Sequence, residues 1–297
     1  MAELRLRGAW TALVTPFSAD GSAVDWDAFD KHIEGQVAGG VQGLVPCGTT
    51  GEAPTLSGSE QEEVIRHTVS VARGRAIVLA GTGTNNTAST IEASRRAVRA
   101  GADAVMAVMP YYSKPSQLGL IEHVRRVASA VEVPVVLYNI PGRCAVELSV
   151  ESTLKVLEQS PNVVGVKDAT ANVLYCQELM SRAGDRVTVM CGDDALTLAM
   201  MSVGARGVIS VTSNVYPKQV EQAVVEALEG RWDSARRRHF ALLPVHRAMF
   251  CEPSPQPVKA ALALEGRMTS AVRPPLVEAS ERCRSRVAEE MRRYEAR

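Results

Sequence analysis

Short apolar runs rich in Val, Ile, Leu and Ala recur along the chain, and longer segments with the apolar spacing of helices lie between them. Runs that are almost wholly apolar are typical of parallel strands covered on both faces. Eight such runs are present: Ala9–Val14, Gly43–Pro46, Ala76–Ala80, Ala104–Met109, Pro134–Tyr138, Val163–Lys167, Val187–Cys191 and Gly207–Val211. Eight strands alternating with helices predict an α/β fold, a (β/α)8 TIM barrel.

The segments between the runs carry the helical part of this pattern. In Asp25–Gly39 the apolar residues recur at steps of three and four, which puts them on one helix face. The same spacing recurs in Thr87–Ala100, Gln117–Ala130, Ser149–Leu157, Ala195–Val203 and Gln219–Leu228. Three helices end in glycine shortly before the next run, as a left-handed helix end requires.

The chain has 297 residues, and barrels of about 250 residues fold as one domain. From about Trp232 the strand pattern stops and proline-broken helical segments follow. We therefore expect a barrel over 1–230 and a C-terminal helical appendage over 231–297. The structural alternative is an open doubly wound sheet, which usually carries a Gly-rich loop after its first strand. Thr15-Pro16-Phe17 stands there instead.

Charge and composition restrict the class of partner. The 33 basic and 33 acidic residues cancel, which disfavours nucleic acid and anionic membranes. The first residues lack an apolar leader and no long uncharged apolar stretch follows, so we expect a cytoplasmic protein. The six cysteines form no C-x-x-C pair and are interpreted as small core residues. No His cluster suggests a metal site, and no cofactor is expected.

Lys167 is the lysine in the most unusual setting, because it ends the apolar run that begins at Val163. Barrel enzymes place their catalytic groups at the C-terminal ends of strands. Burial there would favour the neutral amine, which can attack a ketone and form an imine. The alternative is structural: a lysine that extends to solvent or pairs with Asp168.

Other strand ends also carry polar groups. Gly48-Thr49-Thr50-Gly51 could offer N–H and O–H donors to a carboxylate, although an ordinary polar loop has the same composition. Tyr112 and Tyr138 end two further strands and could relay protons or orient a substrate. Buried rings with satisfied hydroxyls are the structural alternative.

Six motifs in this order resemble the dihydrodipicolinate synthase family of the N-acetylneuraminate lyase and class I pyruvate aldolase superfamily. They extend from the second strand to the eighth: Gly48-Thr49-Thr50-Gly51-Glu52, Pro110-Tyr111-Tyr112, Tyr138-Asn139-Ile140-Pro141-Gly142-Arg143, Gly165-Val166-Lys167-Asp168-Ala169-Thr170, Gly192-Asp193-Asp194 and Gly207-Val208-Ile209-Ser210-Val211.

The resemblance implies a Schiff-base lyase or synthase. Pyruvate would form an imine on Lys167, tautomerise to an enamine and add to L-aspartate 4-semialdehyde, in the diaminopimelate route to lysine. Tyr138 would be the proton relay nearest the imine, with Thr49 and Tyr112 completing a chain to solvent. In this family Tyr112 comes from a neighbouring subunit, so the resemblance also implies a homo-oligomer, a dimer of dimers.

The resemblance also implies how the substrates bind. Thr50, Gly48 and the backbone at Ile209 would hold the pyruvate carboxylate, and Arg143 would pair with the carboxylate of the semialdehyde. Related lyases that act on keto-sugar acids share the lysine and the tyrosine, but arginine at this place is typical of the synthases.

The chain departs from the family pattern near the barrel mouth. Cys144-Ala145 stands where Thr-Gly is usual, and Ala171 stands where glycine is common. These changes put the geometry of the second substrate in question. Asn85 is retained, but the His and Glu typical of lysine-inhibited members are absent, so weak or no inhibition by lysine is expected.

Two other functions stay open from the sequence. The chain could be a Schiff-base lyase for a keto-sugar acid, such as N-acetylneuraminate or a 2-keto-3-deoxy-gluconate type. It could also be a non-catalytic paralogue that binds pyruvate. The joint presence of Lys167, Tyr138, Thr49 and Arg143 favours an enzyme, because a binding protein needs neither nucleophile nor relay.

Overall fold

The computed structural model of the chain describes residues 4 and 6–296. Eight strands follow one another around a closed barrel. They are β1 (Gly8–Ala12), β2 (Gly43–Val45), β3 (Ile77–Gly81), β4 (Ala104–Val108), β5 (Val135–Asn139), β6 (Val163–Asp168), β7 (Thr188–Cys191) and β8 (Gly207–Ser210). β1 pairs in parallel with β2, and the neighbouring strands from β3 to β8 also pair in parallel. Each lies within two residues of its predicted range. The predicted (β/α)8 barrel is confirmed.

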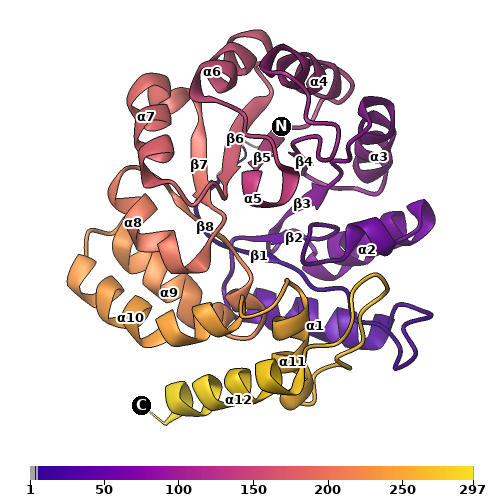
Figure 1. Cartoon of the computed structure of the whole chain (residues 1–297), viewed down its shortest axis with the longest axis vertical. Helices are drawn as coiled ribbons and strands as arrows, with labels where there is room; N and C mark the ends of the chain where they lie inside the picture. The colour runs from indigo at the N-terminus through magenta and orange to yellow at the C-terminus, as the bar shows by residue number, and fades with distance from the viewer. Residues whose placement is uncertain (1–3, 5, 297) are drawn as a thin grey trace. The chain divides into compact units, whose positions relative to one another are not determined.

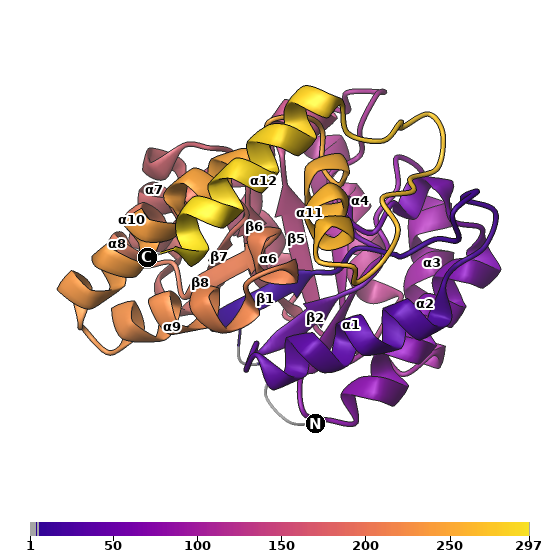
Figure 2. The same cartoon turned by 90° about the horizontal axis from the view of Figure 1, so that it is seen from below.

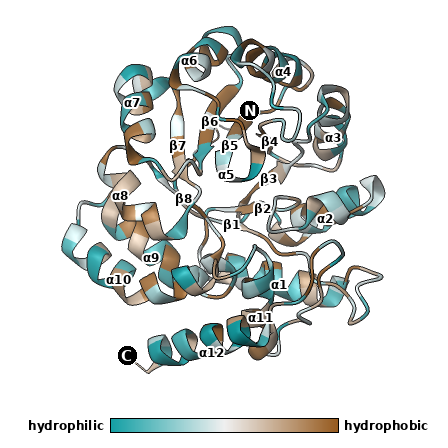
Figure 3. Ribbon diagram, in the orientation of Figure 1, coloured by the Kyte–Doolittle hydropathy of each residue, from teal (hydrophilic) through white to brown (hydrophobic). Residues whose placement is uncertain are grey.

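The chain forms two compact units. One spans 78–209, and the other combines 8–77 with 210–296. The first unit contains α3 (Thr87–Arg99), α4 (Gln117–Ser129), α6 (Val150–Gln159), α7 (Val173–Ala183) and α8 (Thr197–Ser202). In Figure 1, α3, α4, α6 and α7 lie outside β4 to β7. The apolar strands and the polar outer faces of these helices are evident in Figure 3.

Side-chain caps fix where the helices of the first unit begin. Asn86, Ser116, Ser149 and Asn172 each accept a hydrogen bond from a backbone N–H of the first turn of α3, α4, α6 and α7. Such caps satisfy N–H groups that the helix itself leaves unpaired. Each helix therefore starts at a defined residue, which fixes the length of the loop from the preceding strand.

The second unit contains β1, β2 and the C-terminal helices. Its helices are α1 (Trp26–Ala38), α2 (Gly58–Ala72), α9 (Pro217–Leu228), α10 (Trp232–Ala248), α11 (Gln256–Leu264) and α12 (Glu281–Glu295). α12 packs against α10 and α11 (Figure 2). No helix among residues 4 and 6–296 is long and apolar enough to cross a membrane. The predicted boundary at 230/231 stays a prediction.

The cysteines agree with the expectation of small core residues. All six are free thiols, and five of them are buried. Cys251 is the exception, because it is only partly buried.

Candidate active site

Lys167 lies near the C-terminal end of β6, and only 5% of its surface is exposed. The register between β5 and β6 pairs it with Tyr138. Paired residues of parallel strands project from the same face. Lys167 Nζ lies 4.3 Å from the centroid of the Tyr138 ring. The structure thus brings together two of the predicted catalytic residues.

Neither structural role considered for Lys167, a side chain that extends to solvent or one that pairs with Asp168, fits this site. The side chain is buried, so it does not extend to solvent. Asp168 is adjacent on the strand and faces the opposite side. Its Oδ1 accepts hydrogen bonds from Thr170 N at 2.9 Å and Thr170 Oγ1 at 2.7 Å. Within the described residues no carboxylate lies at ion-pair distance from Lys167 Nζ.

Burial lowers the pKa of the Lys167 amine to about 8. The charge of Arg143 lowers this pKa further, whereas Asp194 and Cys191 raise it. At pH 7 an amine with a pKa of 8 is neutral in about one molecule in ten, against about one in 2,500 for lysine in water. The site therefore supplies the neutral amine that imine formation needs.

The rate at which the Lys167 amine reacts with a ketone should rise with pH and level off above about pH 8. Asp194→Asn removes a charge that raises the Lys167 pKa, so it should move the midpoint to lower pH. Arg143→Gln removes a charge that lowers it and should move the midpoint to higher pH. Borohydride trapping at a series of pH values, followed by mass spectrometry, measures both shifts.

The matched control for this pH series is Arg95→Gln, on an exposed position of α3. It should leave the midpoint where it is in the unmodified chain. Shifts of Asp194→Asn and Arg143→Gln in the same direction would contradict the electrostatic account. The effect of Asp194 on Lys167 could not be predicted from the sequence, because it depends on how β7 and its following turn meet β6.

Arg143 lies on the short helix α5 (Pro141–Cys144), and its side chain is exposed. Buried Asn139 holds the base of this segment, because its Nδ2 donates to Leu148 O at 3.0 Å. Leu148 N donates in return to Asn139 Oδ1 at 3.1 Å. These two bonds join the start and the end of the loop. The exposed guanidinium can therefore meet an anion that arrives from solvent.

The two departures from the family pattern lie at backbone positions that suit glycine. Ala145 has a φ of 56° and Ala171 a φ of 58°, both in the left-handed region. A Cβ there costs about 1–2 kcal/mol. Glycine would remove that strain, but it would also increase the conformational entropy of the unfolded chain, which lowers stability by about 0.4–1 kcal/mol.

Ala145→Gly and Ala171→Gly should therefore each raise the free energy of unfolding, by up to about 1 kcal/mol. Urea denaturation measures the change. Ala288→Gly, inside α12, is the control and should lower stability by about 1 kcal/mol. If all three variants lost stability alike, the strain argument would fail.

The Gly48-Thr49-Thr50 turn belongs to the second unit and follows β2. Three backbone bonds close it: Gly51 N to Gly48 O at 3.1 Å, Glu52 N to Thr49 O at 3.2 Å and Ala53 N to Gly48 O at 3.3 Å. Thr49 is half-buried and Thr50 is buried. Thr50 Oγ1 lies 3.5 Å from Ser254 Oγ, a contact that the sequence did not predict. The turn is a rigid polar loop.

A buried ion pair holds the end of this turn. Lys259 Nζ lies 2.5 Å from Glu52 Oε1, and both side chains are fully buried. Lys259 Nζ also donates to Ala271 O at 2.8 Å, and Glu52 Oε2 accepts from Arg273 N at 2.9 Å. Glu52 has a φ of 55°, so these contacts hold it in a sparsely populated conformation. No sequence pattern pointed to Lys259, which lies 207 residues from its partner.

The remaining predicted residues differ in exposure. Ile209 lies in β8 and is 1% exposed. Tyr112 is 88% exposed and has a φ of 73°. A tyrosine with positive φ is uncommon and marks a constrained backbone. Its ring is the most exposed of the large apolar side chains that the structure describes.

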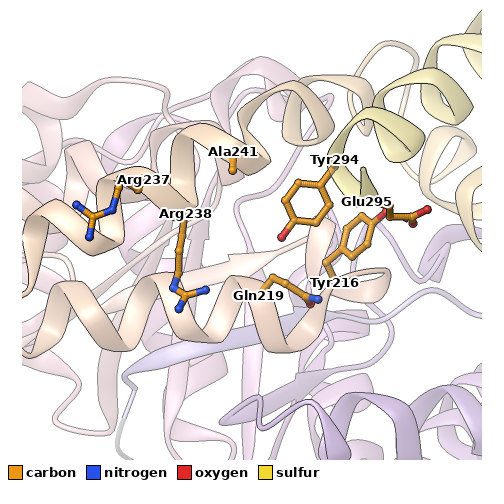
Figure 4. A pocket seen from close by; sticks show the side chains of 7 residues that line it. All are labelled: Tyr216, Gln219, Arg237, Arg238, Ala241, Tyr294 and Glu295. Carbon is orange, nitrogen blue, oxygen red and sulfur yellow. The ribbon is translucent and has the colours of Figure 1, made fainter. Parts of the chain in front are cut away.

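A separate pocket of about 490 Å³ lies in the second unit (Figure 4). Its walls come from the start of α9, from α10 and from α12, and Tyr216 Oη donates to Glu295 Oε1 at 2.8 Å. The rings of Tyr216 and Tyr294 meet edge to face, with their centroids 5.0 Å apart. This pocket contains none of the predicted site residues: it is lined by Tyr216, Gln219, Arg237, Arg238, Ala241, Tyr294 and Glu295.

Comparisons with known proteins agree with this geometry. The chain is 60% identical to the 4-hydroxy-tetrahydrodipicolinate synthase of Sorangium cellulosum over 100% of its length and 99% of the relative's. It is 43% identical to that of Pelobacter propionicus, with 97% and 98% covered. The solved synthase of Methylacidiphilum fumariolicum SolV superposes with a TM-score of 0.96 at 38% identity, with 98% and 97% covered.

A dihydrodipicolinate synthase from Aquifex aeolicus superposes with a TM-score of 0.95 at 41% identity, over 98% of each chain. The model of the dihydrodipicolinate synthetase family matches residues 5–293. A match of this extent includes every strand and all but the last two residues of the C-terminal helices. The chain therefore belongs to the dihydrodipicolinate synthetase family.

Proposed function

We propose that Lys167 attacks the keto carbon of pyruvate and carries it as an imine. The observation that supports this most strongly is a buried amine with a lowered pKa beside Tyr138. The chain is a lyase-type enzyme that condenses pyruvate with L-aspartate 4-semialdehyde to 4-hydroxy-tetrahydrodipicolinate, in the diaminopimelate route to lysine. We infer a cytoplasmic enzyme, because the relatives named above are biosynthetic enzymes.

In this proposal the chain's own groups move the protons. We assign to Tyr138 the proton transfers to and from the substrate beside the imine, and the 4.3 Å between its ring centroid and Lys167 Nζ supports this role. Thr49 and Tyr112 connect Tyr138 to solvent. The exposure of Tyr112 supports its contribution to a neighbouring copy in a homo-oligomer, a dimer of dimers.

Separate groups bind the two carboxylates in this proposal. Gly48, Thr50 and the backbone of Ile209 hold that of pyruvate, and the rigid turn after β2 suits a fixed anion. Arg143 binds the carboxylate of the semialdehyde. Its exposed position within a loop whose two ends are joined by hydrogen bonds supports this role.

A reductase-coupled assay with pyruvate and L-aspartate 4-semialdehyde tests the function directly. We expect turnover with this pair and none with N-acetylneuraminate or a 2-keto-3-deoxy-sugar acid. Arg143→Gln should raise KM for the semialdehyde with little effect on KM for pyruvate. Cleavage of a keto-sugar acid without synthase turnover would assign another second substrate to the same imine chemistry.

A further inference from the structure

Two of the six cysteines lie in direct contact. Cys251 Sγ and Cys283 Sγ are 2.6 Å apart. A disulfide bond would bring the two sulfur atoms to about 2.05 Å. Cys251 follows α10 and is partly buried, whereas Cys283 lies in the first turn of α12 and is 3% exposed.

The residues beside the two thiols hold them together. Glu252 accepts hydrogen bonds from Ser280 N at 3.0 Å and from Ser280 Oγ. Ser280 caps α12 and accepts in turn from Cys283 N at 3.2 Å. The neighbour of one cysteine is thus bonded to the cap that positions the other. Thiols held in this way need little movement to form a bond.

We propose that Cys251 and Cys283 form a reversible disulfide by exchange with a low-molecular-weight disulfide of the glutathione type. The thiolate of Cys251 attacks one sulfur of the small disulfide, whose S–S bond breaks and releases one small thiol. Cys283 then attacks Cys251 in the mixed disulfide and releases the second. Two cysteines are oxidised, one small disulfide is reduced to two thiols, and the two cysteine protons pass to these thiols.

Exposure gives the order of the two attacks. Cys251 is the more accessible thiol, and burial raises the pKa of Cys283 to about 12. Cys283 is therefore the resolving thiol, acting once the mixed disulfide has formed beside it. Of the three residues between Cys251 and Pro255, Ser254 touches Thr50. The disulfide would link α12 to the segment that supports the Thr50 turn.

Thiol counting in the full-length chain tests the proposal. After incubation with oxidised glutathione, alkylation in denaturant should modify four of the six cysteines. A digest should contain one peptide pair joined through Cys251 and Cys283, and dithiothreitol should restore all six thiols. The oxidised chain should melt about 5 °C higher, because the bridge restricts the unfolded state.

Cysteine variants separate this pair from any other. Cys251→Ser and Cys283→Ser should each abolish the internal disulfide, and Cys283→Ser should retain a glutathione adduct on Cys251. The matched control Cys176→Ala, at a buried cysteine of α7, should still lose two thiols. Any of three results in the treated unmodified chain would overturn the proposal. These are six free thiols, a disulfide between two chains, and a glutathione adduct that persists on Cys251.

Discussion

Lys167→Met lowers kcat/KM by at least about a thousandfold, or about 4 kcal/mol of activation free energy, because no other group at the end of β6 can form the imine. The same change should raise the free energy of unfolding by about 1–3 kcal/mol, because a buried charge is replaced by an apolar chain of similar length. The coupled assay measures the first effect and urea denaturation the second.

The pH dependence of this gain follows from the pKa of Lys167, which folding lowers from 10.5 to about 8. Below about pH 8 the buried amine is charged in the folded state, so Lys167→Met raises the free energy of unfolding by its full amount. The gain should shrink as the pH rises toward 10.5, where the unfolded chain also loses its proton.

Lys155→Met, at an exposed position of α6, is the control and should change neither activity nor stability. Unchanged turnover in Lys167→Met would refute the assignment of the nucleophile.

Lys259→Met should have the opposite effect on stability and lower the free energy of unfolding by about 3–5 kcal/mol. This lysine is also buried, and its pKa is also lowered to about 8 by burial. It neutralises Glu52, however, and it lies 4.1 Å from the centroid of the Phe17 ring. Removing it leaves Glu52 as an uncompensated buried charge. Urea denaturation beside Lys167→Met gives the comparison.

A double variant distinguishes charge from packing at this pair. Lys259→Met with Glu52→Gln removes both charges and should recover part of the stability that Lys259→Met loses. If Lys259→Met were instead more stable than the unmodified chain, like Lys167→Met, the ion pair would have no structural importance. Turnover should also fall in Lys259→Met, because Glu52 ends the turn that carries Thr50.

The sequence predicted the strands because each is a short apolar run between glycine turns and amphipathic helices. It did not predict α2 and α7. α2 starts at a capping box formed by Ser57 and Glu60, but its first turns are strongly polar and conceal the apolar face that begins at Val64. α7 follows the cap Asn172, and its exposed Leu174 interrupts the periodic pattern.

The sequence alone could single out Lys167, Tyr138 and Arg143, because the first two lie at strand ends, the third follows β5, and each belongs to a recognisable motif. Other contacts on which the proposals rest join residues that are distant in sequence. Lys259 and Glu52 are 207 residues apart, and Cys251 and Cys283 are 32 apart with no motif between them. Only folding brings these groups together, so no local sequence pattern predicts the contacts between them.

Borohydride reduction in the presence of pyruvate, followed by peptide mass mapping, identifies the residue that forms the imine. We expect one reduced pyruvyl adduct, on Lys167, that is absent from Lys167→Met. Lys259 is the internal comparison, because it is the other buried lysine with a lowered pKa. An adduct on Lys259, or no adduct on either lysine, would contradict the account.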